Sequence, residues 1–342
     1  AYYFPISITM INYSGRVYTY LHIKLQPALE RKYGISMFDV IDRILELSPC
    51  AAVRYRAKRI LGQDIDQDLF AEFYSSKWVE LLKRNQLDDG GYGRFHSQDS
   101  KLKRKFPTTE RAVDSIKMLD IRRGTPLVDR LCDYMEGILK REIEWPDGFE
   151  KNQWYRPAQP LFVASRLSIF GSDCSEFTEV FDCWHSILKE AFADGEYSRE
   201  RADKAAKELL GCAIDGSYIG LNSIYLIELF GNMQSGISDE LNQLYLKWLH
   251  YNGKVIGYTS VVLDQGLSND FSDLYRVYSA LSRFSNFKNE FEKELDHLKG
   301  KRDPDGFWCF GKDFSCQRLS DDWRTPARMK TDHTIMALLL YI

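Results

Sequence analysis

The chain alternates between two kinds of segment, and both have the periodicity of a helix. One kind is apolar on nearly every face, as in 158–170 (AQPLFVASRLSIF), and such a helix is expected to be buried. The other kind carries charges along one face and is expected to form an outer layer. The apolar segments are 51–61, 109–120, 158–170, 220–230, 271–284 and 331–342. The amphipathic segments are 36–48, 78–85, 126–142, 174–192, 238–251 and 287–299.

A short turn signal recurs between these segments. It is an Asp-Gly or Asn-Gly step followed closely by an aromatic residue, and the copies begin at Asp89, Asp147, Asp194, Asn252 and Asp305. Their spacings of 58, 47, 58 and 53 residues indicate a repeated two-helix unit. Six such hairpins leave no buried helix facing solvent when the last unit packs against the first. We therefore predict an all-α fold, an (α/α)6 toroid.

The toroid is expected to form a single domain over 36–342, after an N-terminal extension at 1–35. The charged segment 198–212 is predicted to form an additional helix on the surface. No linker rich in Pro, Gly or Ser divides the chain, so a second domain is not expected.

Composition narrows the classes of function. Hydrophobic residues make up 44% and charged residues 28% of the chain, which is typical of a globular protein. The net charge of −3 gives no basic surface of the kind that nucleic-acid binding requires. Seven cysteines without a CxxC pair favour a reduced, cytoplasmic protein over a disulfide framework. The apolar stretch 1–11 is too short to span a bilayer, so no integral membrane segment is expected. Peripheral contact with a membrane remains possible at this stage, and the sequence does not specify the oligomeric state.

One copy of the turn signal carries a family resemblance. The segment from Trp78 through Gln86 to Asp89-Gly90 and Tyr92 resembles the glutamine–tryptophan repeat of squalene and other triterpene cyclases, and Asp305-Gly306-Phe307-Trp308 is a partial second copy. The resemblance extends to the toroids of terpene cyclases and protein prenyltransferases. It implies a protein that binds or transforms an isoprenoid, or a similar apolar anionic small molecule, in a central cavity. In the cyclases these repeats tie helices together, so a structural role is expected for them here.

The catalytic motifs of those families are incomplete. Asp64-Ile-Asp66-Gln67 has Gln at the last position of the DxDD motif and is interpreted as part of a loop. Asp88-Asp89 and Asp321-Asp322 each lack the third acid of a magnesium-binding DDxxD motif. Asp332-His333-Thr334 resembles part of the prenyltransferase zinc site, with Cys309 as the single candidate thiolate. No cofactor is predicted, and Mg²⁺ or Zn²⁺ remain alternatives.

Topology predicts where a site should lie. In a ring of hairpins the inner helices run parallel, so their N-termini meet at one end, and that end favours an anion. The catalytic candidates at these N-termini are Tyr155, Asp270, Asp273, Asp332 and His333. The candidates for binding a substrate are Glu110, Trp154, Arg156, Tyr218, Asn222, Tyr275, Arg324 and Arg328. Helix capping is the competing explanation, with Thr108, Asn269 or Asp270, and Thr331 as the expected N-caps, and it accounts well for Asp270.

Two other functions compete with the isoprenoid hypothesis. Glycoside hydrolases and polysaccharide lyases also use helical toroids, and they need paired carboxylates, or a Tyr or His base with an Arg that neutralises a uronate. A non-catalytic binding ring is the third possibility. An interior lined by Phe, Leu and Ile would favour an isoprenoid, paired acids would favour a sugar, and a filled interior would favour a scaffold. The basic run 101–105 is interpreted as a solvated loop.

Overall fold

The computed structural model describes residues 37–47, 50–97, 105–148, 155–214, 219–263, 271–310 and 318–341. Within these ranges the fold is all-α, and the extended backbone is limited to isolated bridges. None of the described helices is long and apolar enough to cross a membrane. The six described cysteines are free thiols. The predicted N-terminal extension lies outside the described residues.

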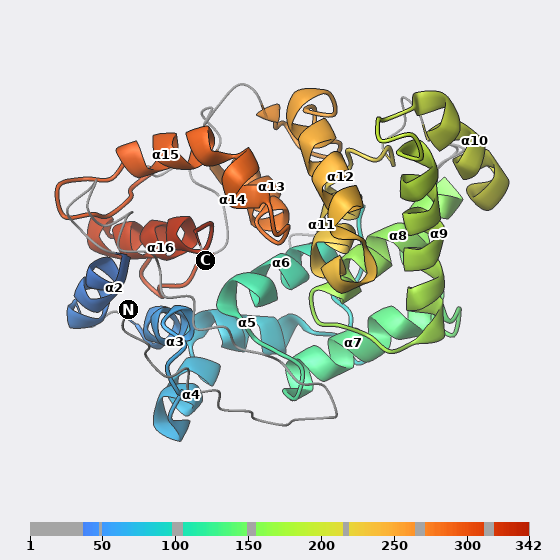
Figure 1. The fold of residues 1–342 in the computed structure, drawn as a ribbon. Helices are drawn as coiled ribbons and strands as arrows, with labels where there is room; N and C mark the ends of the chain where they lie inside the picture. The colour runs from blue at the N-terminus through green and yellow to red at the C-terminus, as the bar shows by residue number, and fades with distance from the viewer. Residues whose placement is uncertain are drawn as a thin grey trace, which may run out of the picture.

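All six segments that were predicted to be buried form helices (Figure 1). Most of their side chains are buried; Leu161, Val163 and Leu167 of the third, for example, are each 0% exposed. These helices are α3 (Ala51–Ile60), α6 (Thr109–Leu119), α8 (Tyr155–Ser168), α11 (Ile224–Asn232), α13 (Phe271–Leu281) and α16 (Pro326–Leu338).

The amphipathic segments also form helices, and their charged faces are exposed. The segment 287–299 does not form one continuous helix, because it is divided at Phe291 into two shorter helices. The helices are α2 (Met37–Glu46), α5 (Lys77–Asn85), α7 (Pro126–Leu139), α9 (Ser175–Ala191), α12 (Asp239–Tyr251), α14 (Phe287–Glu290) and α15 (Glu292–Gly300). The predicted charged surface helix is α10 (Arg199–Leu210), which packs on α9.

One further helix, α4 (Gln67–Tyr74), occupies a segment that was interpreted as a loop. The Asp66 side chain caps it by accepting the backbone N–H of Leu69 at 2.8 Å. Phe73 then stacks on Tyr55 of α3 with ring centroids 4.0 Å apart. The acidic motif at 64–68 therefore caps and begins a helix, so its interpretation as a loop was wrong.

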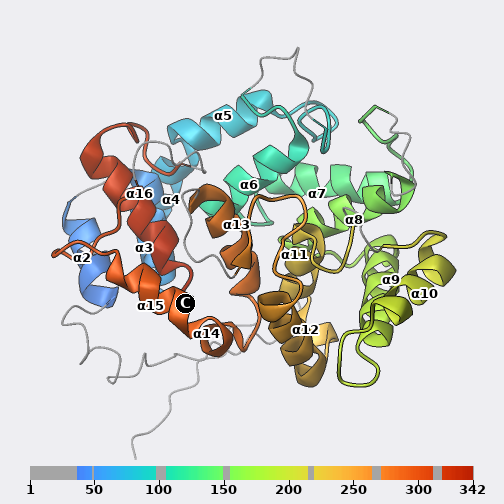
Figure 2. The same ribbon diagram turned by 90° about the horizontal axis from the view of Figure 1, so that it is seen from above.

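Several inner helices pack directly on one another (Figure 2). α11 packs between α8 and α13, and α7 packs on α8. At the other end of the chain α16 contacts both α2 and α3, so the last described helix lies beside the first hairpin.

The turn signal builds the same hydrogen-bond pattern at two distant places. Tyr92 N–H donates to the hydroxyl of Thr109 at 3.2 Å, and Tyr92 Oη donates to the carbonyl oxygen of residue 82. In the second copy Trp308 N–H donates to the hydroxyl of Thr334 at 3.0 Å, and the indole N–H donates to the carbonyl oxygen of residue 298. Each copy thus joins an outer helix to the inner helix that follows, as expected for a structural repeat.

The first copy also ties neighbouring hairpins together. The Gln86 side chain donates to the carbonyl oxygens of Gly90 and Leu127, both at 2.9 Å, and so holds the turn against the start of α7. The Trp78 indole donates to Ser320 O at 2.9 Å, which fixes the loop before α16. These side chains are positioned by the backbone rather than aimed at a ligand.

The start of the last inner helix differs from the prediction, because the N-cap was expected at the wrong residue. α16 begins at Pro326 after Thr325, five residues before the expected start, so Thr331 lies inside the helix and does not cap it. Thr108 does cap α6 through its hydroxyl, as predicted. Proline at the first helical position explains the early start of α16, because proline lacks the N–H that would be unpaired there.

Candidate functional site

The predicted pair Asp332 and His333 lies within α16, and each residue is 4% exposed. Asp332 accepts the backbone N–H groups of Leu319 and Ser320 at 3.1 and 3.0 Å and the Ser320 hydroxyl at 2.5 Å. His333 Nδ1 accepts the N–H of Phe310 at 3.0 Å. Burial raises the pKa of Asp332 to about 6 and lowers the pKa of His333 to about 4. His333 is therefore neutral at pH 7, but because of burial rather than the helix dipole.

The other predicted residues near helix starts make local contacts. The Tyr155 hydroxyl donates to a carbonyl oxygen of the preceding Asp-Gly turn at 3.0 Å. Asn222 donates to a carbonyl oxygen of the loop after α12 at 2.6 Å. Asp273 accepts the hydroxyl of Ser260 at 2.9 Å, and Arg156 is exposed. Trp154, Tyr218 and Asp270 lie outside the described residues.

Three predicted substrate-binding residues belong to α13 and to the α16 region. Tyr275 of α13 is half-buried. Arg328 forms an ion pair with Asp322 at 3.4 Å, and Arg324 is exposed, with its guanidinium carbon 5.6 Å from the ring centroid of Trp323. The structure therefore distributes most of the predicted residues among separate local contacts.

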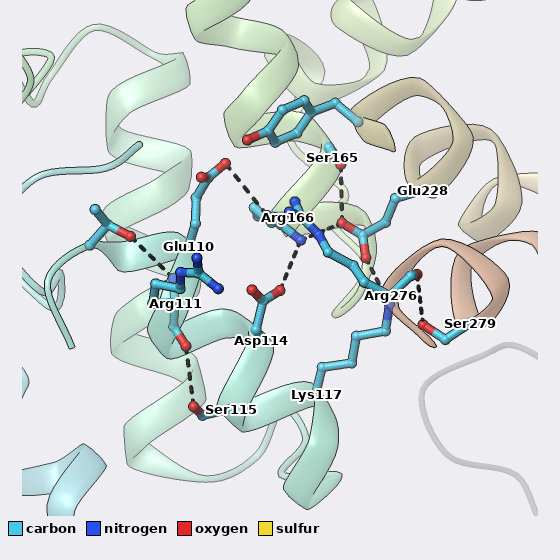
Figure 3. Close-up of polar contacts among 12 residues, drawn as sticks. Glu110, Arg111, Asp114, Ser115, Lys117, Ser165, Arg166, Glu228, Arg276 and Ser279 are labelled. Atoms are coloured by element: carbon cyan, nitrogen blue, oxygen red, sulfur yellow. Dashed lines mark hydrogen bonds and ion pairs between the residues drawn. The ribbon is translucent and has the colours of Figure 1, made fainter. Parts of the chain in front are cut away.

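Glu110 is different, because charged side chains gather around it. It lies on α6 and is 7% exposed. Three further inner helices, α8, α11 and α13, contribute charges to the same place (Figure 3). We call this set the central polar cluster; its members are Glu110, Asp114, Lys117, Arg166, Glu228 and Arg276.

Arg166 is the hub of the central polar cluster. It is 1% exposed, and its Nη1 lies 2.6 Å from Glu228 Oε2 and 3.2 Å from Asp114 Oδ1 (Figure 3). Its Nε lies 3.6 Å from Glu110 Oε1. Burial alone would lower the pKa of Arg166, but these three carboxylates raise it well above its usual value. The guanidinium therefore stays charged and joins α8 to α6 and α11.

The buried carboxylates are held in the ionised form. Glu228 accepts Lys117 Nζ at 2.7 Å and the Ser165 hydroxyl at 3.3 Å, in addition to Arg166. Burial raises the pKa of Glu228, but Lys117 and Arg166 outweigh it and bring the pKa to about 2. The pKa of Glu110 is lowered as well, because Arg166 and the hydrogen bond from His96 outweigh its burial. Neither group is a carboxylic acid that could donate a proton at neutral pH.

Of the three cations in the cluster, Arg276 is the one that forms no ion pair with a described carboxylate. No described carboxylate lies within 4 Å of its guanidinium, whereas Arg166 and Lys117 both have such partners. Burial and Arg166 lower its pKa, but Asp114, Tyr225 and Glu110 raise it further, so it is charged. Its Nε is buried and has no hydrogen-bond partner. Glu110 Oε1 and Arg166 Nε also lack a hydrogen bond, but they face each other as an ion pair at 3.6 Å. The unsatisfied Nε of Arg276 therefore marks the place in the cluster where a small polar molecule would be held.

His96 connects the cluster to an aromatic group. Its Nδ1 lies 2.9 Å from Glu110 Oε2 and 2.9 Å from Tyr225 Oη, so one ring nitrogen contacts a carboxylate and a phenol. Its side chain is 24% exposed, unlike the buried Tyr225. Phe162 stacks on the imidazole at 4.4 Å, and Tyr258 meets it edge-on at 5.4 Å. With Nδ1–H donated to ionised Glu110, the lone pair on Nε2 becomes a proton acceptor.

Two features of the backbone position these rings. Asp147 accepts three consecutive N–H groups, those of Phe95, His96 and Ser97, at 2.6, 2.9 and 2.8 Å. This Asp, predicted to be structural from the repeat, therefore fixes the turn that carries His96. Tyr258 has a positive φ of 63°, which is costly for a residue with a Cβ and is maintained only where surrounding contacts hold it.

The sequence did contain a signal for Arg166 and Glu228. Both interrupt segments that are otherwise apolar on nearly every face, AQPLFVASRLSIF and GLNSIYLIELF. A charge within a helix that must be buried needs a partner of opposite charge, so these two residues had to be paired inside the fold. Searching the helix interiors for charges would have found the cluster, whereas the search at the N-termini reached only Glu110.

Within the described ranges no group of three His, Cys, Asp or Glu side chains is placed to hold a metal ion. Cys309 is exposed, while Asp332 and His333 are bound to backbone N–H groups. Comparisons with family models, with curated proteins and with solved structures found no match. The chemistry of the site therefore has to be inferred from its own geometry.

Proposed function

We propose that this protein is an acid–base enzyme that acts on an acidic sugar by abstracting the proton next to a carboxylate, as polysaccharide lyases do. The observation that carries the proposal is the contact of His96 Nδ1 with both Glu110 and Tyr225. A paired-carboxylate hydrolase is less well supported, because it needs one protonated acid, and Glu110 and Glu228 have lowered pKa values.

In the proposed reaction Arg276 neutralises the carboxylate of the substrate, which makes the neighbouring C–H bond more acidic. His96 Nε2 takes that proton, the electron pair forms a C=C bond, and the β C–O bond breaks. Tyr225 remains protonated at neutral pH, because burial and then Glu110 raise its pKa, so its hydroxyl donates a proton to the leaving oxygen. Solvent then returns a proton to the phenolate of Tyr225 and takes the abstracted proton from Nε2 of the imidazolium, which restores both groups to their starting forms. All protons and electrons are then accounted for.

The charge of the cluster also supports a sugar over a diphosphate. Glu110, Asp114 and Glu228 carry three negative charges, and Lys117, Arg166 and Arg276 balance them. The balanced set offers many donors and acceptors but no excess positive charge. Hydroxyl groups with a single carboxylate fit such a site better than a diphosphate.

The proposal is tested with uronate oligosaccharides, following the ultraviolet absorbance of the new conjugated C=C bond. His96→Gln and Tyr225→Phe should each lower kcat by about 100-fold or more, the range for a lost acid–base group. Arg276→Lys should chiefly raise KM. His185→Gln is the matched control, since His185 lies on the outer helix α9 and stacks on Phe181.

The control should keep full activity. Wild-type protein that forms no unsaturated product from any uronate oligosaccharide would contradict the proposal, as would His96→Gln protein that retains the wild-type rate.

The isoprenoid hypothesis is a second candidate, and one observation favours it. Phe162, Tyr225 and Tyr258 form a group with ring centroids 4.4, 5.0 and 5.4 Å apart, and aromatic faces of this kind stabilise a carbocation. Turnover of isoprenoid diphosphates, lost in Phe162→Leu, would support this function instead.

For the architecture we propose a closed (α/α)6 toroid, in line with the resemblance to the cyclases. The contact of α16 with α2 and α3 supports it, because it brings the two ends of the described chain together. A small-angle scattering profile that fits an open superhelix better than a disc would contradict closure.

A further inference from the structure

A second set of charges shares no residue with the central polar cluster. Lys77 begins α5, Lys105 precedes α6, and Arg318 and Arg324 belong to the segment before α16. All four surround two tryptophans, Trp78 and Trp323. We call these four cations the cationic patch.

The distances within the cationic patch are short. The Nζ atoms of Lys77 and Lys105 lie 5.1 and 5.0 Å from the ring centroid of Trp78, and the guanidinium carbon of Arg318 lies 6.0 Å from it. Arg318 also stacks on Trp323 at 3.4 Å. Three segments distant in the sequence therefore bring positive charge close to one indole ring.

Three of the four cations have no carboxylate partner among the described residues. Lys77, Lys105 and Arg324 are exposed, and no described carboxylate lies within 4 Å of any of the three. Lys77 Nζ donates instead to a backbone carbonyl oxygen, that of Asp321, at 2.9 Å. The carboxylate of the next residue, Asp322, is engaged by Arg328.

Like charges held together in this way repel one another. The pKa of Lys105 is lowered by burial and then by the charges of Arg318 and Lys77. Trp78, which is 8% exposed and anchored through its indole N–H to Ser320, holds the arrangement in place. An anion between the cations would relieve the repulsion, and no described carboxylate lies within 4 Å of Lys77 or Lys105 to do so.

We propose that the cationic patch binds a phosphate-class anion. Lysine ammonium groups act as point charges for phosphate, and a guanidinium adds directed N–H donors. The excess positive charge here contrasts with the balanced central polar cluster and with the net charge of −3 for the chain. The proposal is independent of the proposed reaction, since none of the four cations belongs to the central polar cluster.

The test is calorimetric titration with inorganic pyrophosphate. Wild-type protein should bind it, and the double variant Lys77→Gln/Lys105→Gln should weaken the Kd by about tenfold or more, because two charge-assisted contacts are lost. Lys83→Gln is the matched control. Lys83 also lies on α5 and over an aromatic ring, that of Tyr74 at 3.8 Å, but Glu80 already neutralises it at 2.9 Å.

The control should leave the Kd unchanged within about twofold, as expected for a change outside the site. Equal affinity of the wild type and the double variant, or no binding by either, would overturn the proposal. Binding that is lost in Arg276→Gln but retained in the double variant would also overturn it, because the anion would then sit in the central polar cluster.

A second measurement distinguishes a free phosphate compound from a lipid headgroup. Co-sedimentation with phosphatidylcholine vesicles, with and without phosphatidic acid, is compared for the same variants. Sedimentation that needs phosphatidic acid and is lost in the double variant identifies a lipid headgroup as the source, and pyrophosphate binding without sedimentation identifies a soluble ligand. Both results support the phosphate site, while binding of heparin without pyrophosphate binding would overturn it.

Discussion

Neutralising Glu228 should destabilise the fold strongly, and the structure allows the size of the effect to be worked out. The Glu228 side chain is 4% exposed and accepts Lys117 and Arg166 at 2.7 and 2.6 Å. Its pKa is about 2 in the folded protein, against an ordinary value of 4.5. That difference corresponds to on the order of 3 kcal/mol of unfolding free energy at neutral pH. Breaking a buried ion pair by removing one partner gives a similar cost of about 3–5 kcal/mol.

The assay is urea unfolding of Glu228→Gln and wild type at several pH values. Because the folded pKa of Glu228 is lowered, its contribution is fully present above about pH 4.5 and disappears as the pH falls toward 2. The difference between the two proteins should therefore be largest at pH 7 and should shrink below pH 4.5. Glu80→Gln, which breaks an exposed pair with Lys83, is the control and should change stability little.

The ion-network reasoning would be refuted by either of two results. The first is a loss of less than about 1 kcal/mol at pH 7, the size typical of an exposed pair. The second is a difference between wild type and Glu228→Gln that stays constant from pH 5 to the lowest pH at which both proteins are folded.

Three further predictions concern backbone geometry and protonation. Gly90→Ala should lower the free energy of unfolding by about 3–5 kcal/mol, because Gly90 has φ +92° and a Cβ there would lie 2.2 Å from a backbone oxygen of α7. Gly62→Ala is the control, because Gly62 has φ +66° but open space around it, and it should lower the free energy by only about 1 kcal/mol. Equal losses of stability for the two variants in urea unfolding would contradict this reasoning. Asp147→Ala should shift the NMR signals of the His96 ring and lower stability by about 1–3 kcal/mol, since three N–H groups lose their acceptor; an unchanged His96 spectrum would exclude the positioning role. His333 should stay neutral with its proton on Nε2 until the pH falls to about 4, as nitrogen NMR would reveal, and a titration near pH 6.5 would show that it is not buried.

The pattern of apolar and amphipathic segments was sufficient to predict the buried and exposed helices. It could do so because burial of an apolar surface is a property of each segment and does not depend on its partners. Boundaries depended on single caps and were less certain. α16 begins at Pro326 rather than near Thr331, and α4 was missed because its acidic cap at Asp66 was read as a loop.

The candidate site was harder to predict, because it depends on which side chains meet across helices. Arg166 binds acids that lie 52 and 62 positions away along the chain. His96 comes from a turn that Asp147, about fifty residues later, holds in place. No local pattern specifies these encounters, and they follow only once α6, α8 and α11 are packed together.

Exposure divides the central polar cluster into two parts with different physical roles. Arg166 and Glu228 are shielded from solvent, and their ion pair joins the inner helices α8 and α11 at 2.6 Å. His96 lies at the edge of the same network, where its side chain is 24% exposed, whereas Arg276 is a half-buried residue with a buried Nε. A purely structural network would gain nothing from a histidine on its open side or from a cation without a carboxylate partner. The buried part is therefore best understood as the rigid support that keeps Glu110, and through it His96, in a fixed orientation toward a ligand.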